Sequence, residues 1–203
     1  MTVSTTTTAP VDLDADLLLL PFFEEPAQPL VDALSSTLGE AVARAARDFT
    51  AAEGDVRVAY PEHATAPRAA LIGLGPAADL SRERLRVAAA AGSDAALDHE
   101  ADTVVSLLPD DDTLDDDVVA QGLVEGFVLG AYQYRTYKTD DAFDGPSAFL
   151  LRVGDDHDAD AVDTGVQRGR ALAAAATTAR DLVNRSPDDK TAEGFAELVA
   201  DSG

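Results

Sequence analysis

Three glycines stand four residues apart in the apolar stretch Val118-Val-Ala-Gln-Gly-Leu-Val-Glu-Gly-Phe-Val-Leu-Gly-Ala-Tyr-Gln-Tyr134, at Gly122, Gly126 and Gly130. Residues four apart share one face of an α-helix, so a helix over 118–134 would carry the glycines in one stripe. Each glycine costs about 1 kcal/mol of helix propensity relative to alanine. We therefore expect this face to pack closely against the sheet or a neighbouring helix. A membrane dimerisation face uses similar spacing, but Gln121, Glu125 and the short length argue against it.

The sequence on either side of this helix alternates between short strand patterns and helical patterns. Strands are predicted where apolar residues run continuously or alternate, at 16–23, 55–60, 68–75, 102–108 and 147–153. Helices are predicted at 30–49 with a possible break at Gly39, from a cap at Ser81 to about 97, and at 160–183. The last of these again has small residues four apart, at Ala161, Gly165, Gly169 and Ala173. This order predicts an α/β domain of three layers, with a mixed, largely parallel sheet flanked by helices.

The pattern divides the chain into three parts. Residues 1–12 are rich in threonine and lack a strong periodicity, so we expect a flexible N-terminal tail. Residues 13–183 form the predicted α/β domain. Residues 184–203 contain a polar turn with Pro187 and then the opening of a further helix near Thr191.

Acidic residues dominate the composition. The 203 residues include 38 Asp and Glu against 15 Lys and Arg, which gives a formal net charge of -23. Such a field repels phosphate backbones, so binding of nucleic acid over a broad face is not expected. The absence of cysteine excludes disulfides and thiolate metal sites. No apolar run is long enough to span a membrane, and the N-terminus lacks the pattern of a signal peptide, so we expect a cytoplasmic protein.

One glycine-rich segment follows a predicted strand. Gly73-Leu-Gly-Pro-Ala-Ala78 matches the pattern Gly-x-Gly-x-x-Gly/Ala of dinucleotide-binding proteins. That site requires the glycines to open directly into a helix whose N-terminus holds the pyrophosphate. Pro76 and residues 77–80 delay the helix by about one turn, and the surroundings are acidic. We interpret the segment as an ordinary turn between a strand and a helix.

Two acidic segments resemble ligand clusters for a hard cation, Asp98-His-Glu100 and Asp155-Asp-His-Asp-Ala-Asp160. A calcium loop begun at Asp156 would need glycine and glutamate where the chain has Ala161 and Gln167. A solvated loop that caps the following helix is the better interpretation. The histidines, at 63, 99 and 157, share no helical spacing that would pair them on a metal. The sequence thus predicts no catalytic, cofactor-binding or metal-binding residue in this chain.

Tyr132-Gln-Tyr-Arg-Thr-Tyr-Lys138 is the one cluster of aromatic and basic residues. Its rings could stack on a base or another planar ligand. The cluster falls at a predicted helix C-terminus, where cations favour the helix dipole and tyrosines commonly cover the edge of a core. We favour this structural role.

Two segments resemble a known family. Glu125-Gly-Phe-Val-Leu-Gly-Ala-Tyr-Gln-Tyr-Arg-Thr-Tyr-Lys138 resembles the helix of the leucyl aminopeptidase (cytosol aminopeptidase) family that runs Glu-Gly, then Gly-x-Tyr, and ends in Tyr-Lys. Ala179-Arg-Asp-Leu-Val-Asn-Arg-Ser-Pro-Asp-Asp-Lys-Thr191 is similar to the family's junction Ala-Arg-Asp-Leu-Val-Asn-Thr-Pro-Pro-Asn-Asp-Leu-Thr, with departures at Arg185, Ser186, Asp188 and Lys190. Leu71-Ile-Gly-Leu-Gly75 also stands where the family has it.

The resemblance implies that residues 184–191 link an N-terminal domain, similar to macro domains, to a C-terminal catalytic domain. In the family, that second domain binds two divalent metal ions, Zn or Mn, and the full-length enzymes are homo-hexamers. The family signature Asn-Thr-Asp-Ala-Glu-Gly-Arg-Leu does not occur in these 203 residues. The resemblance therefore implies an N-terminal domain followed by the first helix of a missing catalytic domain, with no metal ligand or catalytic residue in this chain.

Two hypotheses for the function follow. In the first, the chain is the non-catalytic N-terminal domain of a metallo-aminopeptidase that releases N-terminal residues from peptides, and it supports assembly and access to the active sites. In the second, it is a stand-alone module, similar to macro domains, that binds a nucleotide or ADP-ribose through Gly73 and Gly75.

The charge also generates a prediction about salt. A net charge of -23 is typical of adaptation to high salt, because dissolved ions screen the repulsion among the carboxylates. We expect the melting temperature, followed by circular dichroism, to be higher in molar KCl than in low salt. A melting temperature that does not respond to salt would contradict this hypothesis.

Overall fold

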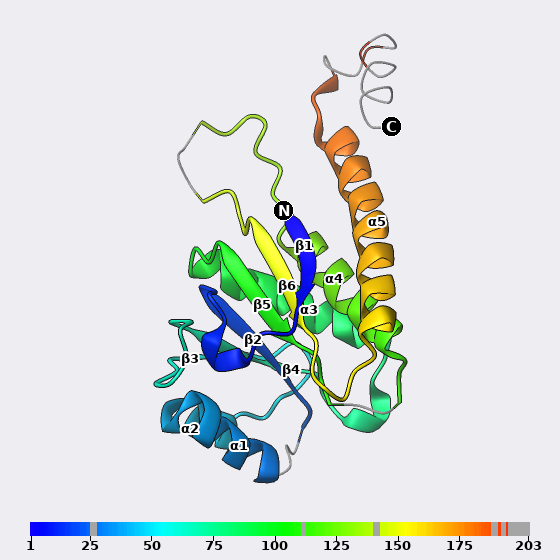
Figure 1. Cartoon of the computed structure of the whole chain (residues 1–203). Coiled ribbons are helices and arrows are strands. Elements are labelled where there is room, and N and C mark those ends of the chain that lie inside the picture. Colours follow the sequence, from blue (N-terminus) through cyan, green and yellow to red (C-terminus); the bar gives the residue numbers. More distant parts are fainter. Residues whose placement is uncertain (25–27, 111–112, 140–142, 188–190, 192–193, 195–203) are drawn as a thin grey trace.

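A computed structural model describes residues 1–24, 28–110, 113–139, 143–187, 191 and 194 of the chain. They form an α/β domain in which one sheet of six strands carries helices on both faces (Figure 1). The strands are β1 (Thr2–Thr6), β2 (Leu17–Phe22), β3 (Val56–Ala59), β4 (Ala69–Gly73), β5 (Thr103–Leu107) and β6 (Ala148–Arg152). The helices are α1 (Gln28–Leu38), α2 (Glu40–Arg47), α3 (Arg82–Asp98), α4 (Asp116–Gly130) and α5 (Ala159–Asn184), with short 3-10 turns η1 (Pro10–Asp12) and η2 (Ala77–Asp79).

The sheet confirms the predicted fold class. Its strand order is β1-β6-β5-β2-β4-β3, and every neighbouring pair is parallel except β3 and β4. The central strand β2 contains Pro21, which has no N–H to donate. The pairing of β2 with β5 ends at Leu19↔Ser106, two residues before this proline. The pairing of β2 with β4 continues through Pro21↔Ile72.

The expectation of a flexible tail over residues 1–12 is wrong for its first half. Residues Thr2 to Thr6 form the edge strand β1, which runs parallel to β6 with the register Thr2↔Ala148 to Thr6↔Arg152. Threonine and valine are β-branched residues that fit a pleated surface. Val3 faces the core and is buried, so the strand is held by packing as well as by its backbone hydrogen bonds.

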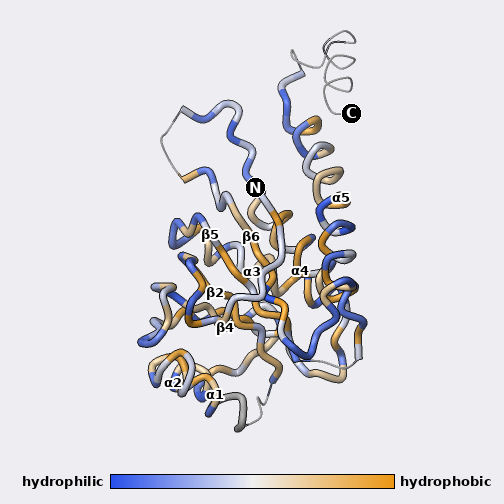
Figure 2. Tube along the Cα trace, in the orientation of Figure 1, coloured by the Kyte–Doolittle hydropathy of each residue, from blue (hydrophilic) through white to orange (hydrophobic). Residues whose placement is uncertain are grey.

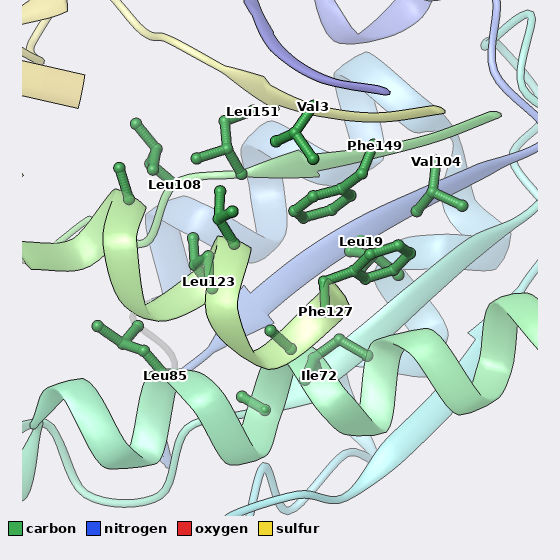
Figure 3. Packing of buried hydrophobic residues seen from close by; sticks show 14 of the residues in the cluster. Val3, Leu19, Ile72, Leu85, Val104, Leu108, Leu123, Phe127, Phe149 and Leu151 are labelled. Atoms are coloured by element: carbon green, nitrogen blue, oxygen red, sulfur yellow. The ribbon is translucent and has the colours of Figure 1, made fainter. Parts of the chain in front are cut away.

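Alternate residues of the central strands belong to two separate hydrophobic cores, one on each face of the sheet. Leu17 and Leu19 of β2 point to the face covered by α3, α4 and α5, whereas Leu18 and Leu20 point to the face covered by α1 and α2. The larger core includes Phe127 of α4, whose ring stacks on that of Phe149 of β6 with centroids 3.9 Å apart (Figure 3). Figure 2 shows hydrophobic residues along the inner strands and hydrophilic residues along the outer loops.

The helix boundaries follow local signals in most places. Gly39, with a φ of +105°, separates α1 from α2, as its position suggested. The Ser81 side chain accepts a hydrogen bond from the Arg84 N–H and caps α3, which confirms the predicted start of that helix. The helix predicted to reach Tyr134 ends at Gly130 instead, because the chain beyond Ala131 turns towards α5.

The glycine stripe of α4 packs on α3, which confirms the expected close approach. A Cβ atom built on Gly126 would lie 2.3 Å from the backbone oxygen of Arg86, and one built on Gly130 would lie 2.3 Å from Oγ of Ser93. On its other side α4 meets the small residues of α5, where a Cβ on Gly165 would lie 2.2 Å from the backbone oxygen of Asp117. The glycines thus let three helices pack at backbone distance over one face of the sheet.

The polar residues of α4 are explained by the same contact. Glu125 is only 1% exposed and lies between α4 and α3. Its Oε2 accepts a hydrogen bond of 2.5 Å from Nε of Arg86, and its Oε1 accepts one of 2.6 Å from Nε2 of Gln121. Because both oxygens have partners, the buried carboxylate is satisfied. No helix among the described residues is long and apolar enough to cross a membrane.

Part of the predicted C-terminal boundary cannot be compared with the structure. Helix α5 ends at Asn184, and residues 188–190, 192–193 and 195–203 lie outside the described residues. The linker and first helix expected over 184–203 therefore stay a prediction.

The glycine contact leads to a stability prediction. Gly126→Leu should lower the free energy of unfolding by about 1–3 kcal/mol, because the backbone of α3 leaves no room for a side chain. Urea unfolding followed by circular dichroism measures the change. Val87→Leu is the matched control, since Val87 lies on α3 and is 37% exposed. An unchanged midpoint for Gly126→Leu would mean that the stripe is not a close contact.

Candidate functional site

In open α/β sheets, ligands commonly bind outside the carboxyl ends of the parallel strands. Here that edge holds a hollow of about 510 Å³. It is lined by the segments that follow β5 and β6 and by the start of α4, with the residues Asp110, Leu114, Asp115, Asp116, Asp117, Asp156, His157, Asp158 and Ala161. The lining is therefore acidic almost throughout.

Several of these carboxylates have structural partners. Asp158 caps α5, because its Oδ1 accepts hydrogen bonds from the N–H groups of Asp160 and Ala161 at 3.0 and 3.2 Å. Asp116 accepts a 2.6 Å hydrogen bond from the N–H of Asp158, and Asp117 pairs with Arg168 of α5. These contacts support the interpretation of residues 155–160 as a loop that caps the helix. The remaining negative charge opposes a pyrophosphate group at this edge.

The backbone geometry explains why glycine stands at positions 73 and 75. A Cβ on Gly73 would lie 2.0 Å from the backbone oxygen of Ala52, and Gly75 has a φ of +73°, which favours glycine. The turn η2 follows, and α3 begins only at Arg82, so the predicted delay of the helix is confirmed. The Arg84 side chain extends to Gly75 and ion-pairs with Glu53 and Asp79.

The family resemblance implies metal ions in the second domain, not at the acidic segments of this chain. Among the described residues, no group of three or more His, Cys, Asp or Glu side chains could hold a metal ion. Asp98 and His99 form the end of α3, and Glu100 follows with a φ of +50°. The acidic segments singled out in the sequence thus supply no set of converging ligands, and no reaction step through a metal can be derived from them.

The tyrosine cluster lies at the end of α5, which sequence analysis did not foresee. Tyr132 donates a 2.7 Å hydrogen bond from its hydroxyl to Oδ1 of Asp181 and accepts one of 3.3 Å from Nδ2 of Asn184. The Arg180 guanidinium lies 5.4 Å from the centre of the Tyr132 ring, and its Nη1 donates to the backbone oxygen of Leu129. Burial, then the hydrogen bond to Asp181, raises the pKa of Tyr132.

A second tyrosine extends this contact past the end of the helix. Tyr137 accepts a 2.7 Å hydrogen bond from the backbone N–H of Ser186, and its ring packs edge-on against that of Tyr134. The contacts support the structural role favoured for the cluster. We call the set Tyr132, Tyr137, Arg180, Asp181 and Asn184 the junction cluster, because it joins the segment after α4 to the C-terminal end of α5.

A wider groove lies beside α5. Its volume is about 660 Å³, and it is bounded by the start of β1, the end of α4, the segment 144–146 and one side of α5. Its lining mixes apolar residues such as Val3 and Val128 with single polar groups such as Arg170 and Asp144.

Comparison with known proteins agrees with this geometry. The model for the N-terminal domain of the cytosol aminopeptidase family matches residues 20–141. The fold and the match together define an α/β domain of the N-terminal type found in this family. The chain belongs to the cytosol aminopeptidase family.

Individual relatives show how much of such a protein the chain covers. It is 33% identical to a probable cytosol aminopeptidase of Chlorobium luteolum and 30% identical to one of Roseiflexus castenholzii. These alignments include 100% and 97% of the chain but only 43% and 39% of the relatives. The chain therefore spans less than half the length of the curated relatives that it matches.

Solved structures of similar proteins have the same fold. The bottromycin maturation enzyme BotP, solved in complex with Mn, superposes with a TM-score of 0.72 at 26% identity, over 92% of this chain and 36% of BotP. A mutant of tomato leucine aminopeptidase gives a TM-score of 0.78 at 20% identity, over 97% of this chain and 41% of its own. The latter likeness concerns the fold alone.

The junction cluster leads to a prediction about Tyr132. Tyr132→Phe should lower the free energy of unfolding by about 1 kcal/mol at pH 7, because Asp181 loses a hydrogen-bond donor. The measurement is urea unfolding, with Tyr60→Phe as the control because Tyr60 is 62% exposed.

The same variant should respond differently to alkaline pH. Since the pKa of Tyr132 is raised in the folded state, its contribution is complete below the ordinary tyrosine pKa of about 10 and is lost as pH rises through the folded value. The difference between wild type and Tyr132→Phe should therefore shrink above pH 10. A difference that is absent at pH 7 would contradict the assigned hydrogen bond.

Proposed function

We propose that this chain is the non-catalytic N-terminal domain of a di-metal aminopeptidase that releases N-terminal amino acids from peptides. The observation that carries the proposal is the family match over residues 20–141, together with relatives more than twice as long. The described residues contain no group that could hold a metal ion. The hydrolytic chemistry is accordingly assigned to polypeptide beyond this domain.

Assembly and access to the active sites are the roles proposed for the domain itself. The partner is the C-terminal catalytic domain, and the full-length protein is proposed to be a cytoplasmic homo-hexamer. The names of the relatives, probable cytosol aminopeptidases, support the proposed cytoplasmic location. The hydrogen bonds of the junction cluster, which hold the end of α5, support a role in positioning a second domain.

We also propose that the protein is adapted to high salt. The structure places the acidic residues at the surface, with Glu125 as the one acidic residue in the buried class among the described residues. Surface carboxylates at a net charge of -23 repel one another, and dissolved salt reduces that repulsion.

The proposal predicts a difference in activity between two polypeptides. The 203-residue chain should not hydrolyse a leucine amide substrate with Mn²⁺ or Zn²⁺ added. The longer polypeptide, expressed with the coding sequence that follows Gly203, should hydrolyse it. A mock purification from cells that lack the gene controls for host aminopeptidases. Turnover that co-purifies with the 203-residue chain would contradict the proposal.

Titration with ADP-ribose tests the alternative of a stand-alone nucleotide-binding module. We expect no saturable binding heat, because the carboxyl edge of the sheet is lined by carboxylates. Tight binding that is lost in Gly75→Val would favour the alternative instead.

A further inference from the structure

The edge of the sheet at β1 carries backbone groups that point away from the sheet. β1 is the end strand of the sheet, next to β6. The N–H of Thr2 donates to the backbone oxygen of Ser147 at 2.7 Å, and the N–H of Val153 donates to that of Thr6 at 2.8 Å. Successive residues of a strand direct their backbone groups to opposite edges, so the N–H and C=O of Val3 point away from β6.

These outward groups of Val3 have no partner in the part of the chain that the structure describes. The residue is 4% exposed, and its side chain points into the core beside Phe149 and Leu151 (Figure 3). Buried backbone N–H and C=O groups nearly always have a hydrogen-bond partner. An unpaired strand edge is a template for a further strand, which would supply both the acceptor and the donor that Val3 lacks.

Val3 also lines the groove of about 660 Å³ beside α5, which we call the β1 groove. β1 and α5 lie side by side (Figure 1), and Oγ1 of Thr5 donates a 2.9 Å hydrogen bond to Asp163 where they meet. Ligand sites commonly have volumes of about 300–1,000 Å³ and combine apolar walls with a few polar groups. The β1 groove fits this description, with the apolar lining residues Val128, Ala131, Ala171 and Ala174.

The charge of the β1 groove differs from that of the acidic hollow at the carboxyl edge. Among its described lining residues the only acidic side chain is Asp144, which pairs with Nε of Arg135 at 2.9 Å. Arg170 also lines the groove and is exposed, and no described acidic residue forms an ion pair with it. A guanidinium without a carboxylate partner favours a ligand that brings one. The net charge of -23 repels polyanions, so a single carboxylate is favoured over several.

We propose that the β1 groove binds the C-terminal end of an extended peptide, which adds a strand to β1 and places its carboxylate on Arg170. The N–H and C=O of Val3 pair with the peptide backbone, and the apolar walls receive alternate side chains of the peptide. This inference rests on the proposed function, because peptides are the substrates of the proposed aminopeptidase. The C-terminal end is the one that such an enzyme does not attack, so the groove gives the same substrate class a second contact.

The test uses an acetylated pentapeptide of valine, threonine and leucine with a free carboxyl end. The acetyl group prevents hydrolysis from the N-terminus. Binding to the 203-residue chain is followed by NMR at about 0.1 M salt, where exposed charges still interact. Bound peptide should slow the hydrogen exchange of the Val3 amide, because that amide donates to the peptide. The same peptide with a C-terminal amide should bind about threefold more weakly, which is the scale of an exposed ion pair.

Two pairs of variants locate the site. Arg170→Gln should weaken binding of the free-acid peptide about threefold and remove its advantage over the amide. Arg44→Gln, which removes the same charge from an exposed position on α2, should change neither. Ala174→Phe should weaken binding at least about tenfold, because its ring fills the groove. Ala175→Phe, at the adjacent exposed position outside the lining, should leave binding unchanged.

The outcomes separate this inference from the proposed function. Absence of saturable binding, or binding that Ala174→Phe leaves unchanged, would overturn the inference. Binding to the 203-residue chain that is lost in the longer polypeptide would overturn it too, because the following polypeptide then occupies the groove. A dimer in light scattering that Ala174→Phe dissociates would assign the groove to a second copy instead. If the longer polypeptide binds the peptide but does not hydrolyse leucine amides, the groove stands and the proposed function fails.

Discussion

The architecture depends on backbone-distance contact between α4 and the helices on either side of it. Gly126 meets the carbonyl of Arg86 in α3, and Gly165 of α5 meets the carbonyl of Asp117 in α4, at separations that exclude any side chain. This spacing brings Phe127 onto Phe149 of the sheet and lets Arg86 reach the buried carboxylate of Glu125. It also sets the course of α5, and therefore the point at which the chain leaves the domain.

Two features of the domain bear on the proposed function, namely the contacts at the end of α5 and the acidic surface. The junction cluster ties the end of α5 to the segment after α4, and α5 also carries the exposed apolar residue Leu172. The carboxyl edge of the sheet, where related architectures bind ligands, is lined by aspartates that cap helices or repel anions. These features motivate the proposal that the domain positions a neighbouring domain.

Much of this fold could be predicted from the sequence because its signals are local. The glycine spacing indicated close packing, Ser81 indicated the start of α3, and the apolar runs located all strands except β1. β1 was missed because five residues rich in threonine acquire their structure by pairing with β6, which lies more than 140 residues away. The junction cluster was missed for the same reason, since Tyr132 and Asp181 meet only after α5 packs on α4. The sequence did single out the two sides of this contact separately, through the tyrosine-rich segment 132–138 and through the family resemblance of residues 125–138 and 179–191.

Metal content tests the central claim, that the chemistry lies outside this domain, most directly. Equilibrium dialysis against Mn²⁺ should be done at high salt, where the acidic surface retains few loosely held cations. The account predicts no saturable Mn²⁺ site in the 203-residue chain and two per chain in the longer polypeptide. One or more tight sites in the 203-residue chain would contradict it.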